Sequence, residues 1–287
     1  MQLFLQVLLN GLLQGGLYAL MALGLALVWG VLNIVNLSHG AFIMVGGYVC
    51  WALFNYLHLD PFVALIPTAA LLFMLGYGVQ RLILNAVVRG PMFNTLLITF
   101  GLEVIFTYLV QLAFSADFRT INPSYSGANI SRFNLTLPLV NLAVFALALV
   151  LTICMWLFLL HSRIGRSIRA TAQNLTAARL YGVEPRHLYA MTFGLGTALA
   201  GVAGGLYGQV SQLNPYIGVT LTAKCFAISI IGGLDSPLGV IVGGLILGVI
   251  EALTALYIGP TFVDAVSFGI LVLVLVVRPT GLLGPTT

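Results

Sequence analysis

Long apolar runs, interrupted by short polar breaks, make up most of this chain. The runs cover residues 3–29, 41–57, 62–80, 92–114, 138–160, 188–210, 217–234, 238–258 and 261–277. Most are close to the ~20 residues that an α-helix needs to cross the hydrocarbon core of a bilayer. Because a helix satisfies its own backbone hydrogen bonds in lipid, the pattern predicts an all-α, polytopic membrane helical bundle. We expect eight to nine hydrophobic segments in one transmembrane domain, 1–287.

Two of the breaks, near 33–40 and 232–237, carry no basic residue that would mark an aqueous loop. Each offers a helix-start signal, because a serine can accept the free N–H groups of a new helix and a proline suits its first turn. Irregular backbone at membrane depth is tolerated where protein covers it or where it lines a cavity. We therefore predict broken or re-entrant helices at both places. The second break consists of Gly232, Gly233, Asp235, Ser236 and Pro237.

The two breaks resemble each other, because Ser38 precedes Gly46 by the same eight residues that separate Ser236 from Gly244. An internal repeat, common in transporters, would explain this match, and so would biased composition. Small residues also recur at a spacing of four, which favours close helix packing within one bundle over a ligand site. These pairs are Gly11/Gly15, Gly201/Gly205, Gly204/Gly208, Gly239/Gly243 and Gly244/Gly248.

Composition and charge add the solvent and the orientation. Only 6% of the residues are charged, against about 25% in soluble domains, so the bilayer must be the solvent. Eight of the eleven basic residues are Arg81, Arg89, Arg278 and the five arginines of 162–187. Since short cytoplasmic loops are enriched in Lys and Arg, we expect an outside N-terminus, a cytoplasmic C-terminus and an external loop at 115–137. The protein is then a multi-pass protein of the cell (inner) membrane, and its net charge of +4 does not indicate nucleic acid.

The basic stretch 162–187 also predicts a cytoplasmic helix. Residues 167–180 are rich in helix formers, with Ile168, Ala172 and Leu175 on one face. Gly182 is placed to end this helix in a left-handed conformation. A short amphipathic helix of this kind fits a groove of another protein or the surface of anionic lipid. The pattern alone does not choose between the two.

Polar side chains inside the apolar runs are candidates for a translocation path. Asn33, Asn36, Ser38 and His39 fall within seven residues of one another at the first break, and Glu103 lies in the middle of a run. Ionisable groups in membrane segments are costly and often functional. A helix N-terminus at the break would favour an anionic group such as an amino-acid carboxylate. Alternatively, His39 is a hydrogen-bonded structural residue, and Glu103 pairs with another segment or is held protonated.

Three further ionisable residues, Lys224, Glu251 and Asp264, lie nearer the ends of their runs, where we expect snorkelling or interfacial positions. No phosphate-binding loop, dinucleotide fingerprint or metalloprotease motif occurs. The three cysteines lie in apolar runs without metal-ligand spacing. We therefore expect no catalytic site, no metal and no bound cofactor.

Four stretches carry a resemblance to a known family. They are NGLLQGGLYALMALGLALVWGVLNIVNLSHGAFIMVGGY, GRSIRATAQNLTAARLYGV, IIGGLDSPLGVIVGGLILGVIE and VRPTGLLG, in this order along the chain. With them the chain resembles the LivH-type permease subunits of ABC importers for branched-chain amino acids, a family that also includes amide and urea permeases. The external loop 115–137 matches no family motif, so no substrate-class residue carries over there.

The resemblance implies partners. It implies a homologous second permease in a heterodimer, two cytoplasmic ATPase subunits that use the ATP, and an extracytoplasmic substrate-binding protein. The matched central stretch implies the element that couples to the ATPase, namely Arg169, Ala170, Asn174, Ala177, Ala178 and Gly182. Urea or short amides are the alternative substrates. An ion-coupled secondary transporter or channel, with Glu103 as its carboxylate, is the alternative of another class.

Overall fold

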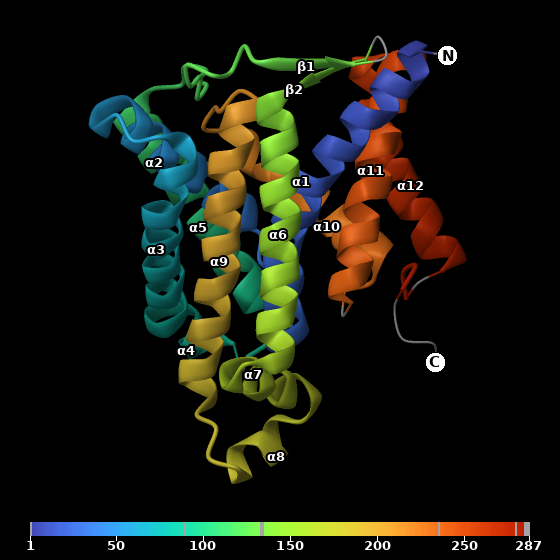
Figure 1. Ribbon diagram of the computed structural model, residues 1–287. Helices are drawn as coiled ribbons and strands as arrows, with labels where there is room; N and C mark the ends of the chain where they lie inside the picture. The colour runs from blue at the N-terminus through green and yellow to red at the C-terminus, as the bar shows by residue number, and fades with distance from the viewer. Residues whose placement is uncertain (1, 89, 133–134, 235, 279, 284–287) are drawn as a thin grey trace.

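The computed structural model of the protein is a bundle of long helices (Figure 1), and it describes residues 2–88, 90–132, 135–234, 236–278 and 280–283. Within these residues, eight helices are long and apolar enough to cross a membrane, which confirms the predicted polytopic bundle. The long helices are α1 (Gln2–Leu32), α2 (His39–Leu57), α3 (Pro61–Val79), α5 (Met92–Phe114), α6 (Leu139–His161), α9 (Pro185–Val210), α11 (Pro237–Tyr257) and α12 (Val263–Val277). The shorter elements are η1 (Gln80–Leu84, a π-helix), α4 (Asn85–Val87), α7 (Arg163–Gln173), α8 (Leu175–Leu180), α10 (Ile217–Gly232) and η2 (Pro260–Phe262).

Helices α1 and α9 form the centre of the bundle, with 89% and 78% of their apolar windows buried. Helix α1 packs on α11, α9 and α6, and α9 packs on α3 and α2. Glycines bring α1 and α11 close together, since a Cβ on Gly15 would stand 2.7 Å from the Leu245 Cα. This contact confirms that the glycine pairs of these helices serve packing within the bundle. Helix α12 is peripheral and exposes most of its apolar side chains.

One end of the bundle carries a β-hairpin that the sequence did not predict. Strand β1 (Asn129–Arg132) pairs antiparallel with β2 (Leu135–Pro138). The start of α1 is fastened to this hairpin, because Gln6 Nε2 donates to the Thr136 carbonyl at 2.7 Å and Thr136 N donates to Gln6 Oε1 at 2.9 Å. The N-terminal end of the chain therefore lies beside the loop 115–137.

The rest of this loop packs back onto the helices. Arg119 and Leu213 exchange backbone hydrogen bonds of 2.9 and 2.7 Å, and Tyr125 Oη donates to Asp60 Oδ2 at 2.9 Å. Burial, together with this bond to Asp60, raises the pKa of Tyr125, so the phenol stays a donor at neutral pH. The loop is thus a folded cap over one end of the bundle.

Helices α7 and α8 lie at the opposite end (Figure 1). Arg81, at the foot of α3, is 3.7 Å from Glu184 beside them. Leu282 N donates to the Ile231 carbonyl at 2.8 Å, so the last described residues lie by the end of α10, away from the β-hairpin. The basic residues 163–186 and Arg81 therefore gather at one end of the bundle. This matches the predicted distribution, although which end faces the cytoplasm stays a prediction.

Candidate translocation and coupling elements

The first predicted break lies inside the bundle. Helix α1 ends at Leu32 and α2 begins at His39, and the side chains of Asn36, Ser38 and His39 are completely buried. The irregular backbone between the two helices is thus covered by protein, as the sequence predicted. In this conformation the three polar residues face one another and their neighbours rather than an open passage.

Two threonine hydroxyls from other helices satisfy the backbone of this break. Thr222 of α10 accepts from Gly40 N at 2.8 Å and donates to the Leu37 carbonyl at 3.2 Å. Thr99 of α5 accepts from Leu37 N and donates to the Val35 carbonyl, both at 3.2 Å. Unpaired backbone groups in an apolar interior cost several kcal/mol each, so these two residues are functional parts of the break. Sequence reasoning missed them.

Ser38 does not act as the predicted helix cap. It makes no capping hydrogen bond to α2; its hydroxyl donates to Asn36 Oδ1 at 2.7 Å instead, and its backbone N–H donates to the same oxygen at 3.2 Å. The cap prediction was wrong because the nearby Asn side chain competes for the serine, while Thr222 binds the free N–H of Gly40.

His39 has a partner on one side of its ring. Nε2 lies 2.9 Å from the Met21 carbonyl of α1, and since a carbonyl only accepts, Nε2 is the protonated nitrogen. Nδ1 has no hydrogen-bond partner among the described residues. The contact with α1 agrees with the structural interpretation of His39 and fixes where α2 begins.

The other two candidate path residues lie apart from this group. Asn33, with φ of 52°, is exposed at the foot of α1 and lines a separate cavity. Glu103 of α5 is 7% exposed and accepts from Thr107 Oγ1 at 3.2 Å. Among the described residues, no hydrogen bond joins Glu103 to the break. The structure therefore brings together three of the five predicted residues.

The second break, between α10 and α11, is also present. Gly233 adopts φ of 103° after Gly232 ends α10. Ser236 Oγ accepts from Gly239 N at 3.1 Å, and Pro237 occupies the first turn of α11. The predicted cap and proline are thus confirmed, whereas Asp235 lies outside the described residues.

The interfacial prediction for Lys224 and Glu251 was wrong. Lys224 Nζ is 2.8 Å from Glu251 Oε1 and 3.3 Å from Asp264 Oδ1, and the Lys224 and Glu251 side chains are only 13% and 8% exposed. Tyr18 Oη donates to Glu251 Oε2 at 2.7 Å, and Ser267 Oγ donates to Oε1 at 3.0 Å. This ionic cluster joins α1, α10, α11 and α12. The sequence misled because position along a run does not show which face of the helix is covered by protein. Asp264 is 57% exposed, as an interfacial residue would be.

The predicted helix in the basic stretch is two helices. Asn174, with φ of −155°, interrupts it, and its side chain accepts from Ala177 N at 3.0 Å, capping α8. Gly182, with φ of 82°, ends α8 as predicted. Val183 N donates to the Ala178 carbonyl at 3.2 Å and Gly182 N to the Arg179 carbonyl at 3.0 Å, which is the Schellman pattern.

Helix α8 projects beyond the bundle (Figure 1). At its tip Leu180 and Tyr181 are 84% and 89% exposed, an apolar pair that sequence reasoning missed. Their position directly before Gly182 was the available signal. Of the predicted coupling residues, Ala170 and Asn174 are exposed, Ala177 is half-buried and Ala178 is buried. Arg169 turns to the bundle, where its Nη2 donates to the Leu160 carbonyl at 3.0 Å.

A polytopic bundle with a covered helix break and a protruding basic segment defines an integral membrane transport subunit. The family model described as the permease component of branched-chain amino acid transport systems matches residues 7–275. The chain belongs to this family of permeases.

Relatives match over nearly the whole length. The chain is 32% identical to the high-affinity branched-chain amino acid transport system permease protein LivH of Escherichia coli, and 33% identical to BraD of Pseudomonas aeruginosa, over 98% of this chain and 96% of each relative. It is 27% identical to the permease protein LivM of E. coli, over 94% of this chain and 68% of LivM. No solved structure matches the chain.

Proposed function

We propose that this permease is one subunit of an ATP-driven importer that moves branched-chain or other hydrophobic amino acids across the cell membrane. The observation that carries the proposal is the similarity to LivH and BraD over 98% of the chain. A second, homologous permease is the expected partner, and the similarity to LivM supports it. Two cytoplasmic ATPases would supply the energy, and an extracytoplasmic binding protein would deliver the substrate.

Helix α8 is the proposed contact with the ATPase. Its exposed Leu180 and Tyr181 form an apolar knob of the kind that fits a groove on a partner. The end of α8 leads through Gly182 directly into α9, whose Pro185 occupies the first turn. A displacement of α8 would therefore act on α9, which lies at the centre of the bundle.

Helix α3 would move together with α9. At the base, Arg81 faces Glu184 at 3.7 Å and Asn85 Nδ2 donates to the Arg186 carbonyl at 3.1 Å. Higher up, Thr197 Oγ1 donates to the Leu72 carbonyl at 2.9 Å. These contacts support a rigid pair that carries motion from the coupling end into the membrane.

We place the translocation path beside the first break, where α2 and α10 begin. Gly40 of α2 packs against Gly218 of α10, so the starts of two helices meet there, and helix N-termini favour anionic groups such as a carboxylate. The complete burial of Asn36, Ser38 and His39 corresponds to a closed state of this path. Glu103 is kept as a candidate lining residue, and Asn33 is left out because it lines another cavity.

Reconstitution tests the proposal. In proteoliposomes, leucine uptake should require the second permease, the ATPases, the binding protein and ATP. ATP-independent uptake by this chain alone would identify a secondary transporter or channel instead. In that case Glu103→Gln should abolish ion coupling. Competition between labelled leucine and excess urea or acetamide in the full assembly decides the substrate class, because effective competition by urea or acetamide would favour the amide and urea alternative.

A further inference from the structure

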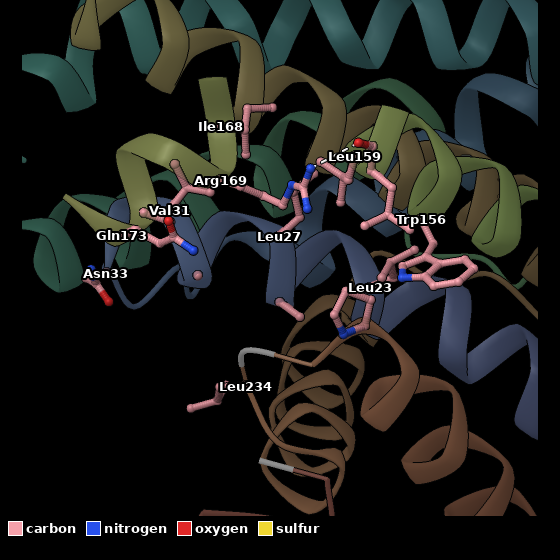
Figure 2. Close-up of a pocket in the computed structure, with 15 residues that line it drawn as sticks. Leu23, Leu27, Val31, Asn33, Trp156, Leu159, Ile168, Arg169, Gln173 and Leu234 are labelled. Atoms are coloured by element: carbon pink, nitrogen blue, oxygen red, sulfur yellow. Dashed lines mark hydrogen bonds between the residues drawn. The ribbon is translucent and has the colours of Figure 1, made fainter. Parts of the chain in front are cut away.

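A cavity of about 530 Å³ opens between the foot of α1, the end of α6, α7 and the second break. Figure 2 shows Arg169 among the lining residues, with Trp156 towards one end and Asn33 and Gln173 towards the other. Its volume is within the ~300–1,000 Å³ typical of ligand pockets. The remaining lining residues are Leu23, Ala26, Leu27, Gly30, Val31, Leu159, Leu160, Ile168, Ala172, Leu234 and Pro237.

The lining combines an apolar wall with one cation. The wall comes from membrane-spanning parts of α1 and α6, whereas Arg169 belongs to α7, just beyond the end of α6. Arg169 takes part in no ion pair among the described residues; its Nη2 donates to the Leu160 carbonyl at 3.0 Å. The guanidinium therefore keeps its charge and further N–H groups for a ligand.

We propose that this cavity binds an anionic phospholipid, with one acyl chain against the α1–α6 wall and the phosphate at Arg169. Basic pockets between membrane helices at the cytoplasmic boundary suit anionic headgroups, and a guanidinium binds phosphate through two parallel hydrogen bonds. Arg163 and Arg166, exposed on the same helix, add positive charge beside the headgroup. The site goes beyond the transport function and does not depend on which substrate is moved.

The lining fits a lipid better than it fits an amino acid. Arg169 could meet a carboxylate, but no described lining residue is acidic, so an ammonium group would have no counter-charge. The break at Asn174 separates the two activities that one amphipathic helix would otherwise have to combine. Helix α7 holds lipid, and α8 is free to meet a protein.

Fluorescence quenching of Trp156 tests the proposal. The tryptophans are residues 29, 51 and 156, so the variant Trp29→Phe/Trp51→Phe reports on the cavity alone. The full chain is placed in nanodiscs containing phosphatidylglycerol or phosphatidylcholine brominated on the acyl chain. We expect phosphatidylglycerol to quench at lower mole fraction than phosphatidylcholine. Arg169→Gln should weaken this preference about five-fold, the effect of one basic residue beside anionic lipid.

Two variants and two competitors sharpen the outcome. Arg166→Gln removes the same charge from the same helix outside the cavity lining and should leave the preference largely unchanged. Ala172→Phe fills the cavity and should reduce quenching by both lipids. Equal quenching by the two lipids, or an unchanged preference in Arg169→Gln, would overturn the proposal. Relief of quenching by leucine would assign the cavity to substrate, and relief by millimolar inorganic phosphate would assign Arg169 to a free anion, so either result would also overturn it.

Discussion

At the scale of single residues, a few polar side chains decide where helices start and stop inside the membrane. Thr222 and Thr99 satisfy the backbone of the first break, and Gly182 ends α8 in a conformation that favours glycine. Each is a small residue whose effect comes from its position, so each can be tested by a conservative change.

Thr222→Val keeps the shape of the side chain and removes its hydroxyl. The N–H of Gly40 and the carbonyl of Leu37 would lose their partner in a buried site, which costs about 1–3 kcal/mol. We expect a lower unfolding temperature in detergent. Thr220→Val, the same change at an exposed position of α10, is the control, and equal effects of the two variants would show that the Thr222 hydroxyl is not needed.

Gly182→Val tests the end of α8. A Cβ at this position has no neighbour within 4 Å, so the substitution acts through φ alone, at about 1–2 kcal/mol. The strain should shift the α8–α9 junction and uncouple ATP hydrolysis from uptake, with normal membrane insertion. Gly182→Asn tolerates the left-handed region and should retain coupling. Wild-type uptake per ATP in Gly182→Val would argue against α8 as the coupling element.

The residue scale also shows the limit of sequence reasoning. The cap at Ser236 and the left-handed Gly182 could be predicted because their signals are local. The hydroxyls of Thr99 and Thr222 could not, because they reach residues 62 and 182 positions away along the chain. Ser38 misled for the related reason that a neighbouring asparagine competes with a helix for its hydroxyl.

At the scale of elements, the short helix α10 holds two parts of the bundle together. Thr222 contacts the first break, and Lys224 binds Glu251 of α11 and Asp264 of α12. The long helices could be predicted closely because a bilayer sets their length and apolar character. The β-hairpin and the interruption at Asn174 could not, since neither depends on the membrane.

Lys224→Met tests the ionic cluster. It leaves Glu251 buried with two donors but without its cation, and breaking a buried pair in this way costs about 3–5 kcal/mol. We expect a clear fall in the denaturation midpoint in mixed micelles. Lys224→Met/Glu251→Met removes both charges and should recover most of the loss. If the double variant is no more stable than the single one, the pair is not the source of the effect.

At the scale of the whole molecule, the two ends of the bundle differ in chemistry. One end carries the β-hairpin and the start of α1, and the other carries the arginines, α8 and the last described residues. This asymmetry supports the orientation predicted from the basic residues, with α8 in the cytoplasm, and it can be measured directly.

Cysteine labelling measures the orientation. With the native cysteines replaced by serine, Tyr181→Cys at the tip of α8 and Asn122→Cys in the loop 115–137 are both exposed positions. A membrane-impermeant maleimide added to intact cells should label Asn122→Cys and leave Tyr181→Cys unlabelled, and inverted vesicles should give the opposite pattern. Labelling of Tyr181→Cys in intact cells would reverse the proposed topology.

The interruption at Asn174 has a consequence for how such permeases can diversify. Because α8 is capped by its own asparagine and ended by its own glycine, residues 174–182 form a cassette with few side chains committed to the bundle. A cassette of this kind can be exchanged between related permeases to change the ATPase they accept, while the membrane part keeps its substrate. Transplanting it is a direct route to chimeric importers that draw on the motor of another system.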